Sequence, residues 1–372
     1  EGFSPSPPID EAGIAKMRAH FLANLDVNGT GAVVASPGAV PALEGFDCPG
    51  GYGFHWARDG ALSMQALQLI AHSEVGTAGG GPQVTSATVD AAMQRYAAWV
   101  RRLQGMDGRN FTLEGRSVAI DSHGEPKWNI STGEPYAFAW CRPQTDGPPL
   151  QAQALMTFAA GAGPALRAEL WELIKFDLDW LAEDGKVKEE SCDLWEETRD
   201  KNFFWNRVAM RAALQKGSNF ALSMGDHERS EAYRRALEDE VGDPVGEHLR
   251  FHVNAAGNYL TECPLAGSGK PCVDYGKDHI DGAVILALIH GGRMKRRPEG
   301  PHVGTSGSPD EADNLNPLTR PVATEVARTV QIYNEAFCDL YPVNQRDSEA
   351  RVPGVLYGRY LKDRYGGGNP WQ

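Results

Sequence analysis

The sequence predicts an all-α fold, and three observations favour this class. Apolar residues recur every three or four positions through most of the chain, which is the spacing of one helix face. The two-residue alternation of a half-buried strand is scarce. Stretches rich in Gly and Pro, which interrupt regular structure, separate the periodic segments. The expected architecture is therefore a set of helices joined by long loops.

Three helices are predicted from regular apolar stripes. The first stripe follows Asp10, whose side chain can accept a hydrogen bond from the first turn of a helix. Each stripe should face the core. The residues of the three stripes are Ile14, Met17, Phe21 and Leu25; Val89, Met93, Tyr96, Val100 and Leu103; and Val322, Val326, Val330, Tyr333, Phe337 and Leu340.

Weaker helical patterns and long connections make up the rest of the chain. The weaker helices are expected over 59–72, 148–160, 165–182, 202–215, 229–240 and 280–291. The connections cover 26–58, 104–147, 183–200, 241–279 and 341–372. Loops of this length in a compact domain usually carry function. No internal repeat or low-complexity linker is recognisable, so residues 1–372 are expected to form a single domain.

Composition excludes some classes of partner. The formal net charge is -13, and the basic residues are scattered rather than clustered. A binding surface for nucleic acid needs a basic patch, so no nucleic-acid partner is expected. The chain has no apolar run of about 18 residues, so no membrane association is expected either. We expect a monomer.

Cysteines and glycosylation sequons favour an oxidising compartment. The six cysteines include no CxxC pair and no spacing typical of a metal site, so no metal is expected. Cys263 and Cys272 are the best candidates for a disulfide. The chain starts with Glu1 rather than Met, which indicates a mature or excised chain. A secreted glycoprotein is expected, with a vacuolar or lysosomal location as the alternative. The sequons begin at Asn28, Asn110 and Asn129.

The segment DLWEE, residues 193–197, combines three carboxylates with a tryptophan in five residues. An exposed acidic face would not need large apolar neighbours. A carboxyl group that packs against indole is instead typical of an enzyme acid that stays protonated near neutral pH. The aromatic residues of this region should exclude water from such an acid: Trp195, Phe203, Phe204 and Trp205.

Two further loops have similar chemistry. Sugars present hydroxyl groups and C–H faces, so a site for them needs planar hydrogen-bonding groups and aromatic platforms. In the first loop Arg58 and Asp59 could also form an exposed ion pair, or Asp59 could cap a helix. In the second, the aromatic residues could only pack the loop onto the helices. The loops are GYGFHWARDGAL, with Tyr52, Trp56, Arg58 and Asp59, and GEPKWNISTGEPYAFAWCRPQTDGPPLQAQAL, with Glu125, Lys127, Trp128, Tyr136, Trp140, Arg142, Gln144 and Asp146.

Glycoside hydrolysis needs two carboxyl groups, one protonated and one ionised. Glu196 and Glu197 cannot supply both, because consecutive side chains diverge on a helix or a strand. One of the two must therefore have another role, and the second catalytic carboxylate must come from elsewhere.

Five motifs, in this order and spacing, resemble the glucoamylases of glycoside hydrolase family 15. The resemblance covers the chain from about Ile14 to Gln372. It implies an (α/α)6 barrel with a pocket at one end and no metal or organic cofactor. It also implies exo-acting release of α-1,4-linked, and more slowly α-1,6-linked, glucose from non-reducing ends of starch or glycogen, with inversion to β-glucose. The motifs are GYGFHWARDGAL, GEPKWN, AWCRPQTDGPPLQAQAL, DLWEE followed by FF, and GRYLKDRYGGGNPW.

The resemblance assigns roles around the scissile bond. Glu196 resembles the general acid, and Glu197 resembles a ligand for the sugar beyond the bond. Asp193 resembles the residue that supports this loop. Trp140 resembles a tryptophan that packs on the acid and the substrate. Further residues resemble sugar-binding positions: the hydroxyl-gripping pair Arg58 and Asp59, the subsite walls Tyr52 and Trp56, the binding residues Lys127, Tyr136, Trp195 and Arg359, and the rim aromatic Trp371.

The general base of the family has no counterpart in this sequence. In the family it is a glutamate in a later segment, after further barrel helices. We therefore expect a C-terminally incomplete chain that lacks the last helices and is inactive by itself. Alternatives are a trehalase or an isomaltose-type glucosidase of the same fold, or a non-catalytic glucan-binding or regulatory relative.

Overall fold

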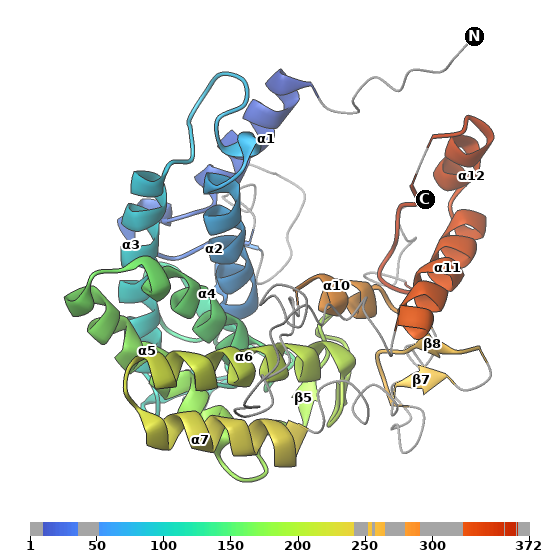
Figure 1. Ribbon diagram of the computed structural model, residues 1–372. Coiled ribbons are helices and arrows are strands. Elements are labelled where there is room, and N and C mark those ends of the chain that lie inside the picture. Colours follow the sequence, from blue (N-terminus) through green and yellow to red (C-terminus); the bar gives the residue numbers. More distant parts are fainter. Residues whose placement is uncertain are drawn as a thin grey trace, which may run out of the picture. The chain divides into compact units, whose positions relative to one another are not determined.

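The computed structural model describes residues 10–35, 52–241, 252–254, 257–264, 280–290, 323–352, 354–361 and 363. Helices dominate this part of the chain, and the strands are short and paired two by two (Figure 1). The all-α prediction is therefore confirmed. Two compact units make up the chain: unit 1 contains Glu1–Glu183 and Lys216–Ser230, and unit 2 contains Asp184–Gln215 and Glu231–Gln372.

Unit 1 is built around α4, Gly147–Gly161, which packs between α2 and α5. Almost every residue of α4 from Gly147 to Ala159 is buried, so this helix is enclosed on all sides. Helix α3 contacts all three of its neighbours. The bounds of the helices in this unit are α1 Glu11–Ala23, α2 Ala57–Ala71, α3 Ser86–Gln104 and α5 Pro164–Ala182, with short 3-10 turns η1 Val27–Gly29 and η3 Glu74–Gly76.

The short strands of unit 1 lie inside the long predicted connections. Strand β1, Phe54–Trp56, pairs antiparallel with β4, Lys127–Asn129. Strands β2, Asn110–Leu113, and β3, Arg116–Ala119, form a hairpin. These pairs hold the loops that carry the candidate site residues.

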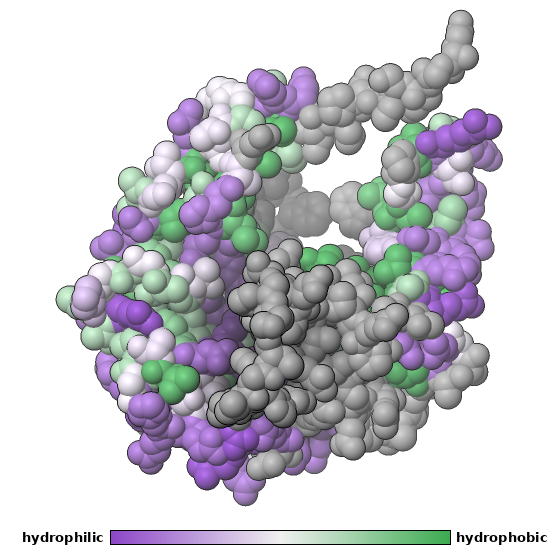
Figure 2. Space-filling view, viewed as in Figure 1, coloured by the Kyte–Doolittle hydropathy of each residue, from purple (hydrophilic) through white to green (hydrophobic). Residues whose placement is uncertain are grey.

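Helix α6, Phe204–Ser223, and helix α7, His227–Arg235, contribute residues to both units. Helix α7 is strongly charged and buries only Tyr233, and Figure 2 shows the hydrophilic surface at the lower edge, where this helix lies. The other elements of unit 2 are η4 Lys186–Lys188, β5 Ser191–Cys192, β6 Arg199–Asp200, the π-helix η5 Ala236–Val241, β7 Val253–Asn254, β8 Tyr259–Leu260, α10 Gly282–His290, α11 Ala323–Leu340 and α12 Pro342–Glu349.

Most helix predictions are confirmed, but two boundaries differ. The helix predicted over 202–215 extends to Ser223, and the one predicted over 229–240 begins at His227 and changes to a π-helix at Ala236. The segment 341–372 was interpreted as a connection, and this is wrong for Pro342–Glu349, which form α12. Pro in the first turn, where its missing N–H has no helical partner, starts this short helix.

Val330 and Leu340 of α11 are exposed although both were predicted to face the core, and the apolar stripe predicted for α1 is wrong at Met17. Asp10 does cap the helix, because its side chain accepts from the N–H of Gly13 at 2.7 Å. Met17, however, is 51% exposed, whereas the neighbouring Arg18 is only 3% exposed. The Arg18 guanidinium reaches the loop after α2 and donates to four carbonyl oxygens, those of Val75, Ala78, Gly80 and Pro82.

Replacing Arg18 by Met should destabilise unit 1. Methionine fills a similar volume but leaves four carbonyl oxygens of this loop without these donors, and each lost hydrogen bond to a charged group costs about 1.5–3 kcal/mol. We expect the free energy of unfolding to fall by at least about 3 kcal/mol, measured by urea denaturation. The control is Met17→Gln at the exposed neighbouring position, which should change stability by less than about 0.5 kcal/mol. Equal stability of both variants would contradict this role of Arg18.

The cysteines and sequons are partly described. Cys141, Cys192 and Cys263 are each disulfide-bonded, and Cys338 is a free thiol. Cys272 lies outside the described residues, so its pairing with Cys263 stays a prediction. Asn28 and Asn110 are exposed and Asn129 is half-buried, and glycosylation at these sites also stays a prediction. None of the described helices combines the length and apolar composition that a transmembrane span requires.

Candidate active site

The pairing of β1 with β4 brings two predicted site residues side by side in unit 1. Trp56 lies directly opposite Lys127 in the antiparallel register. Helix α2 begins at Ala57, immediately after Trp56. Arg58 and Asp59 therefore lie in the first turn of α2, and the interpretation of Asp59 as the N-cap is wrong because Trp56 occupies that position.

Gly60 lets the β1 strand lie closely against α2. An added Cβ at Gly60 would stand 2.2 Å from the Cε1 atom of His55, a separation that no real structure tolerates. His55 is fully buried, and its Nδ1 atom lies 3.1 Å from both the nitrogen and the oxygen of Val33. Burial lowers the pKa of His55 to about 4, so the ring is neutral near pH 7. A neutral, immobile imidazole thus fixes the position of Trp56 and the start of α2.

Lys127 is fully buried and lies among aromatic rings. Its Nζ atom is 3.8 Å from the ring centroid of Trp140 and 4.0 Å from that of Tyr136. The rings of Phe54 and Trp56 are 4.7 and 4.6 Å away. Aromatic faces attract a cation, and the attraction is larger where water is excluded. Lys127 therefore holds four aromatic side chains around its ammonium group. We call these residues, Phe54, Trp56, Tyr136 and Trp140, the aromatic wall.

The aromatic wall continues to the surface. Trp56 and Trp140 meet edge to face with ring centroids 5.9 Å apart. Tyr52 stacks on Trp56 at 6.1 Å and is 48% exposed. An exposed tyrosine on a buried indole offers a flat surface of the kind that sugar C–H faces require. Tyr52, Trp56, Lys127, Tyr136 and Trp140 thus form one cluster.

Arg58 is held in place by acceptors from the second predicted loop. Its NH1 group donates to Gln144 Oε1 at 3.0 Å and to Asp146 Oδ2 at 3.1 Å. Its Nε atom lies 3.4 Å from Asp59 Oδ2. The side chain of Asp146 is almost fully buried, whereas that of Asp59 is 41% exposed. Asp59 therefore presents a carboxylate to solvent beside a fixed guanidinium. This arrangement can form charge-assisted hydrogen bonds with hydroxyl groups.

A buried ion pair supports the loop beneath this cluster. Arg142 donates from Nε and NH2 to the two carboxylate oxygens of Glu125 at 2.6 and 3.0 Å. The same guanidinium also donates to the carbonyl oxygens of Tyr136 and Phe138. Burial raises the pKa of Glu125, and the hydrogen bonds from Arg142 oppose this shift. This bidentate pair fixes the loop and gives Glu125 and Arg142 a supporting role.

The DLWEE segment of unit 2 is the tip of a β-hairpin. Strand β5 pairs with β6 through Ser191↔Asp200 and Cys192↔Arg199. Asp193 is 1% exposed, and its side chain accepts from three backbone N–H groups of the tip. The distances are 2.8 Å from Glu197, 2.9 Å from Thr198 and 3.3 Å from Trp195. Asp193 therefore shapes the tip through these three hydrogen bonds.

Glu196 lies at the strained position of the hairpin. Its φ of +64° falls in the left-handed region, which residues other than Gly seldom adopt. The N–H of Glu196 closes the turn by donating to the carbonyl oxygen of Asp193 at 3.0 Å. Such strain persists only where the surroundings enforce it and is frequent at functional sites. Here the three hydrogen bonds accepted by Asp193 enforce the conformation.

The side chain of Glu197 binds two residues near the end of the described chain, Arg359 and Tyr360. Tyr360 donates its hydroxyl hydrogen to Glu197 Oε2 at 2.6 Å, and Arg359 NH1 lies 2.8 Å from Oε1. The Arg359 guanidinium lies over the rings of Trp195 and Tyr360, at 5.6 and 5.3 Å from their centroids. Burial and the hydrogen bond to Glu197 raise the pKa of Tyr360, so its hydroxyl stays protonated as a donor. Asp363 accepts from Arg359 on the other side.

Trp195 and the aromatic residues that follow the hairpin differ in their roles. The Nε1 group of Trp195 donates to Asp281 Oδ1 at 2.8 Å, and the ring is half-buried. Phe203, Phe204 and Trp205 are almost fully buried and anchor the start of α6. These three residues therefore belong to the core of unit 2, which accounts for their position without a role in the site.

The sequence-based site residues thus form two clusters, one in each unit. The first contains Tyr52, Trp56, Arg58, Asp59, Lys127, Tyr136 and Trp140, and the second contains Asp193, Trp195, Glu196, Glu197 and Arg359. Convergence of both clusters on one pocket stays a prediction, and Trp371 lies outside the described residues. Sequence reasoning missed Tyr360, Asp363 and Asp281. The first two were detectable, because they follow Arg359 at one and four positions in GRYLKD.

Replacing Asp193 by Ala should loosen the hairpin tip. The variant removes three hydrogen bonds, each worth about 0.5–1.5 kcal/mol, and leaves the strained φ of Glu196 unsupported. We expect amide exchange at Glu197 and Thr198 to accelerate at least about tenfold, measured by hydrogen exchange with mass spectrometry. Asp193→Asn is the matched control, because its amide oxygen retains the bonds to these two residues. Unchanged exchange in the Ala variant would show that Asp193 does not hold the tip.

Comparisons with known proteins identify the same family that the sequence motifs resemble. The family model described as "Glycosyl hydrolases family 15" matches residues 19–372. Among curated proteins, Glucoamylase-1 of Schizophyllum commune is 26% identical over 99% of this chain and 54% of its own length. Glucoamylase-1 of Arthroderma benhamiae is 28% identical over 94% of this chain and 49% of its own length. The chain thus spans about half the length of these curated relatives.

Solved structures show the same likeness. The glucoamylase from Saccharomycopsis fibuligera has a TM-score of 0.66 and 21% identity, and the match covers 99% of this chain and 73% of that one. The Hormoconis resinae glucoamylase has a TM-score of 0.65 and 24% identity, with 97% of this chain and 54% of that one covered. These likenesses show the fold of the chain, which is that of the (α/α)6 barrel, as the motifs predicted.

Proposed function

Because the chain belongs to glycosyl hydrolases family 15, we propose that it supplies the general acid and the sugar-binding groups of an exo-acting glucan hydrolase. The substrate is the non-reducing end of a starch- or glycogen-type polysaccharide. The enzyme cleaves α-1,4 bonds, and α-1,6 bonds more slowly, and inverts the anomeric centre to release β-glucose. The curated relatives support this proposal, because they are described as glucoamylases.

One observation carries the assignment of the acid. The adjacent glutamates of the hairpin have different surroundings, because Glu197 is bound to Arg359 and Tyr360. A carboxylate paired with a guanidinium is held in a fixed position and is suited to bind sugar hydroxyls. Glu196, at the strained tip, is therefore assigned the proton transfer to the glycosidic oxygen. Glu197 and Arg359 then bind the sugar on the leaving side of the bond.

The unit 1 cluster suits the terminal glucose. Arg58 and Asp59 supply hydrogen bonds to its hydroxyls, and Tyr52 and Trp56 supply flat apolar faces. The oxocarbenium-like transition state carries positive charge, which the electron-rich face of Tyr52 stabilises. Lys127, buried behind Trp56 and Trp140, keeps this wall in position.

Inversion also requires a carboxylate that activates water, about 6.5–9.5 Å from the acid. No residue of the chain is assigned to this role. Azide is an anionic nucleophile that needs no base, so it can replace activated water. We therefore propose that the 372-residue chain turns over maltose very slowly in buffer and forms β-glucosyl azide when azide is added.

The test follows products of maltose, soluble starch, trehalose and isomaltose by NMR, with and without azide. The proposal predicts β-configured products from maltose and starch, and glucose as the first sugar released. An α-configured product would contradict inversion, and longer oligosaccharides would contradict exo action. Preference for trehalose or isomaltose would identify the alternative glucosidases. Saturable maltose binding without any product would indicate a non-catalytic relative.

The location is proposed to be outside the cell, with a vacuole or lysosome as the alternative. Disulfide-bonded Cys141, Cys192 and Cys263 support an oxidising compartment. The partner is an α-glucan chain, and the protein is proposed to act as a monomer.

A further inference from the structure

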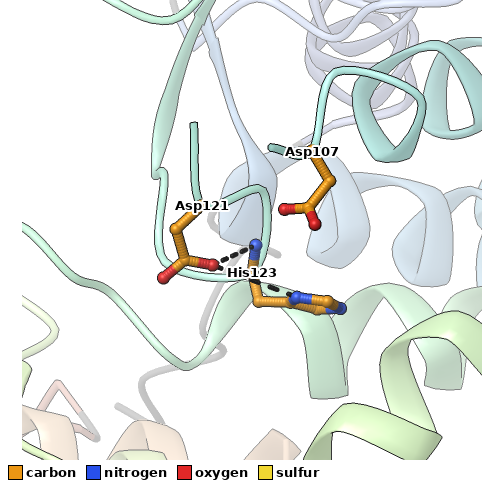
Figure 3. A group of neighbouring side chains, drawn as sticks. All are labelled: Asp107, Asp121 and His123. Atoms are coloured by element: carbon orange, nitrogen blue, oxygen red, sulfur yellow. Dashed lines mark hydrogen bonds and ion pairs between the residues drawn. The ribbon is translucent and has the colours of Figure 1, made fainter. Parts of the chain in front are cut away.

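A histidine and two aspartates lie together in unit 1, apart from the residues assigned to glucan hydrolysis (Figure 3). Asp107 belongs to the turn that follows α3, and Asp121 and His123 belong to the loop that follows β3. Their potential ligand atoms all lie within 4.8 Å of one another. Asp107 and Asp121 are exposed, whereas His123 is 9% exposed. A buried imidazole thus stands beneath two surface carboxylates.

The orientation of the His123 ring is fixed. Its plane is stacked on Trp180 at 4.8 Å with 5° between planes, and on Phe176 at 4.4 Å with 16° between planes. The Nε2 atom lies 3.2 Å from the carbonyl oxygen of Phe176. A carbonyl oxygen only accepts, so Nε2 carries the hydrogen. In the neutral ring, Nδ1 is then a lone pair.

That lone pair is directed at the carboxylates. Nδ1 lies 4.0 Å from Asp121 Oδ1, and two acceptors facing each other repel. Figure 3 marks this pair with a dashed line. A cation placed among Nδ1 and the carboxylates converts the repulsion into three attractive contacts. Ligating histidines commonly donate their other N–H to a backbone carbonyl, as His123 does to Phe176.

We propose that Asp107, Asp121 and His123 bind a divalent transition-metal ion of the Zn²⁺ class, with water completing the coordination. One imidazole nitrogen and two carboxylate oxygens suit Zn²⁺ better than Ca²⁺ or Mg²⁺, which prefer oxygen ligands alone. Bonds of about 2.0–2.2 Å require the ligand atoms to approach more closely than they do now. The exposed aspartates can make this movement, whereas the stacked imidazole stays fixed.

The surrounding hydrogen bonds prepare the aspartates for this role. Asp107 Oδ1 accepts from both the N–H and the hydroxyl of Ser122, at 2.9 and 3.0 Å. Asp121 Oδ1 accepts from the N–H of His123 at 3.1 Å. Within the part of the chain that the structure describes, the second oxygen of each aspartate accepts no hydrogen bond, so it can bind a metal in addition to these bonds. The ion would therefore tie the α3 turn to the loop after β3 and, through His123, to α5.

The site has a structural link to the candidate active site. The carbonyl oxygen of Asp121 accepts from the N–H of Glu125 at 2.9 Å, and that of Gly124 accepts from the N–H of Gln144 at 2.9 Å. Glu125 and Gln144 hold Arg142 and Arg58. Metal binding should thus stabilise the loop that carries the aromatic wall, as a structural ion rather than a participant in the reaction.

The test measures Zn²⁺ binding to chelator-treated protein by isothermal titration calorimetry. We expect one equivalent to bind saturably and to raise the melting temperature. Asp107→Asn and Asp121→Asn should each weaken binding by more than about 10-fold, because each removes a charged ligand and even the loss of an outer-shell partner costs about that much. Both variants retain an amide oxygen for the existing hydrogen bonds, so the fold should be kept. Asp90→Asn, an exposed change elsewhere in unit 1, is the matched control and should bind like the parent.

A second measurement identifies the histidine. Cu²⁺ bound at Nδ1 lies close to the Trp180 ring and should quench its fluorescence, so Trp180→Phe should lose a defined part of the quenching. The proposal is overturned if Zn²⁺ binds without saturation, or if Asp121→Asn and Asp90→Asn bind equally well. It is also overturned if quenching is the same with and without Trp180. None of these readouts depends on glucan hydrolysis.

Discussion

Replacing Glu196 by Gln should lower the rate of maltose cleavage by about 10²–10⁴-fold, the typical contribution of general acid catalysis. Glutamine has the same shape but no proton to donate to the glycosidic oxygen. Because the side chain lies at a turn closed by backbone hydrogen bonds to Asp193, the substitution should leave the hairpin intact. The measurement is kcat for maltose, with azide present where turnover in buffer is too slow.

A substrate whose leaving group needs no proton distinguishes loss of the general acid from loss of the folded structure. Fluoride departs without protonation, so α-glucosyl fluoride should be cleaved by Glu196→Gln at a much larger fraction of the parent rate than maltose is. Glu197→Gln is the matched control, since it removes one charge from the neighbouring position. We expect this control to raise KM more than it lowers kcat, because Glu197 binds the leaving-side sugar. Maltose turnover by Glu196→Gln within about tenfold of the parent would refute the assignment.

Local sequence signals predicted a helix start beside Arg58 and Asp59. Arg58 and Asp59 were expected before a helix and lie in the first turn of α2. The partition of Glu196 and Glu197 into different roles followed from the divergence of adjacent side chains, and the pairing of Glu197 with Arg359 agrees with it. These inferences depend only on short stretches of chain.

Features that depend on contacts across long sequence separations were not predictable. The interpretation of Asp59 as a cap failed because β1 runs directly into α2, and that pairing is set by β4 more than 70 residues later. The carbonyl oxygens that bury Arg18 lie about 60 residues away in sequence. The hydrogen bond from Tyr360 to Glu197 spans 163 residues. Periodicity cannot reveal such partners, because they leave no pattern within one segment.

A short helix, α12, was also not predicted from the sequence. Helix α12 has only eight residues, most of them polar, so it shows no apolar stripe. Its start at Pro342 and the hydrogen bonds that the Asn344 amide donates to the carbonyl oxygens of Phe337 in α11 and of Leu356 hold it in place. Tertiary contacts rather than intrinsic pattern therefore determine this element.

Asp177 should make the stability of unit 1 fall steeply as pH rises. This residue of α5 is 1% exposed, and its carboxylate accepts from Gln104 of α3 at 3.1 Å and from Gln151 of α4 at 3.0 Å. Burial raises its pKa from 3.8 to about 8, although the two glutamine hydrogen bonds lower it. The folded state thus holds a proton that the unfolded state releases above pH 4. The contribution of protonated Asp177 to the free energy of unfolding is complete below pH 3.8 and is lost progressively up to about pH 8.

Asp177→Asn should remove this pH dependence. Asparagine stays neutral, its oxygen can accept from Gln104, and its amide can donate to Gln151 once that side chain turns its amide group. Gln104 cannot turn in this way without losing its bond to the carbonyl oxygen of Leu173. Each pKa unit corresponds to about 1.4 kcal/mol, so the variant should exceed the parent in unfolding free energy by several kcal/mol at pH 8. Both proteins should be about equally stable at pH 4.

Urea denaturation followed by circular dichroism between pH 4 and 9 measures this difference. The exposed control Asp90→Asn should follow the parent at every pH. The curves of unfolding free energy against pH for the parent and Asp177→Asn should meet at low pH and separate as pH rises. Only the parent must either bury a charged carboxylate or keep a proton that the unfolded chain releases to water. Curves that run parallel over the whole range would mean that Asp177 is ionised in the folded state, with the glutamine hydrogen bonds outweighing the cost of burial.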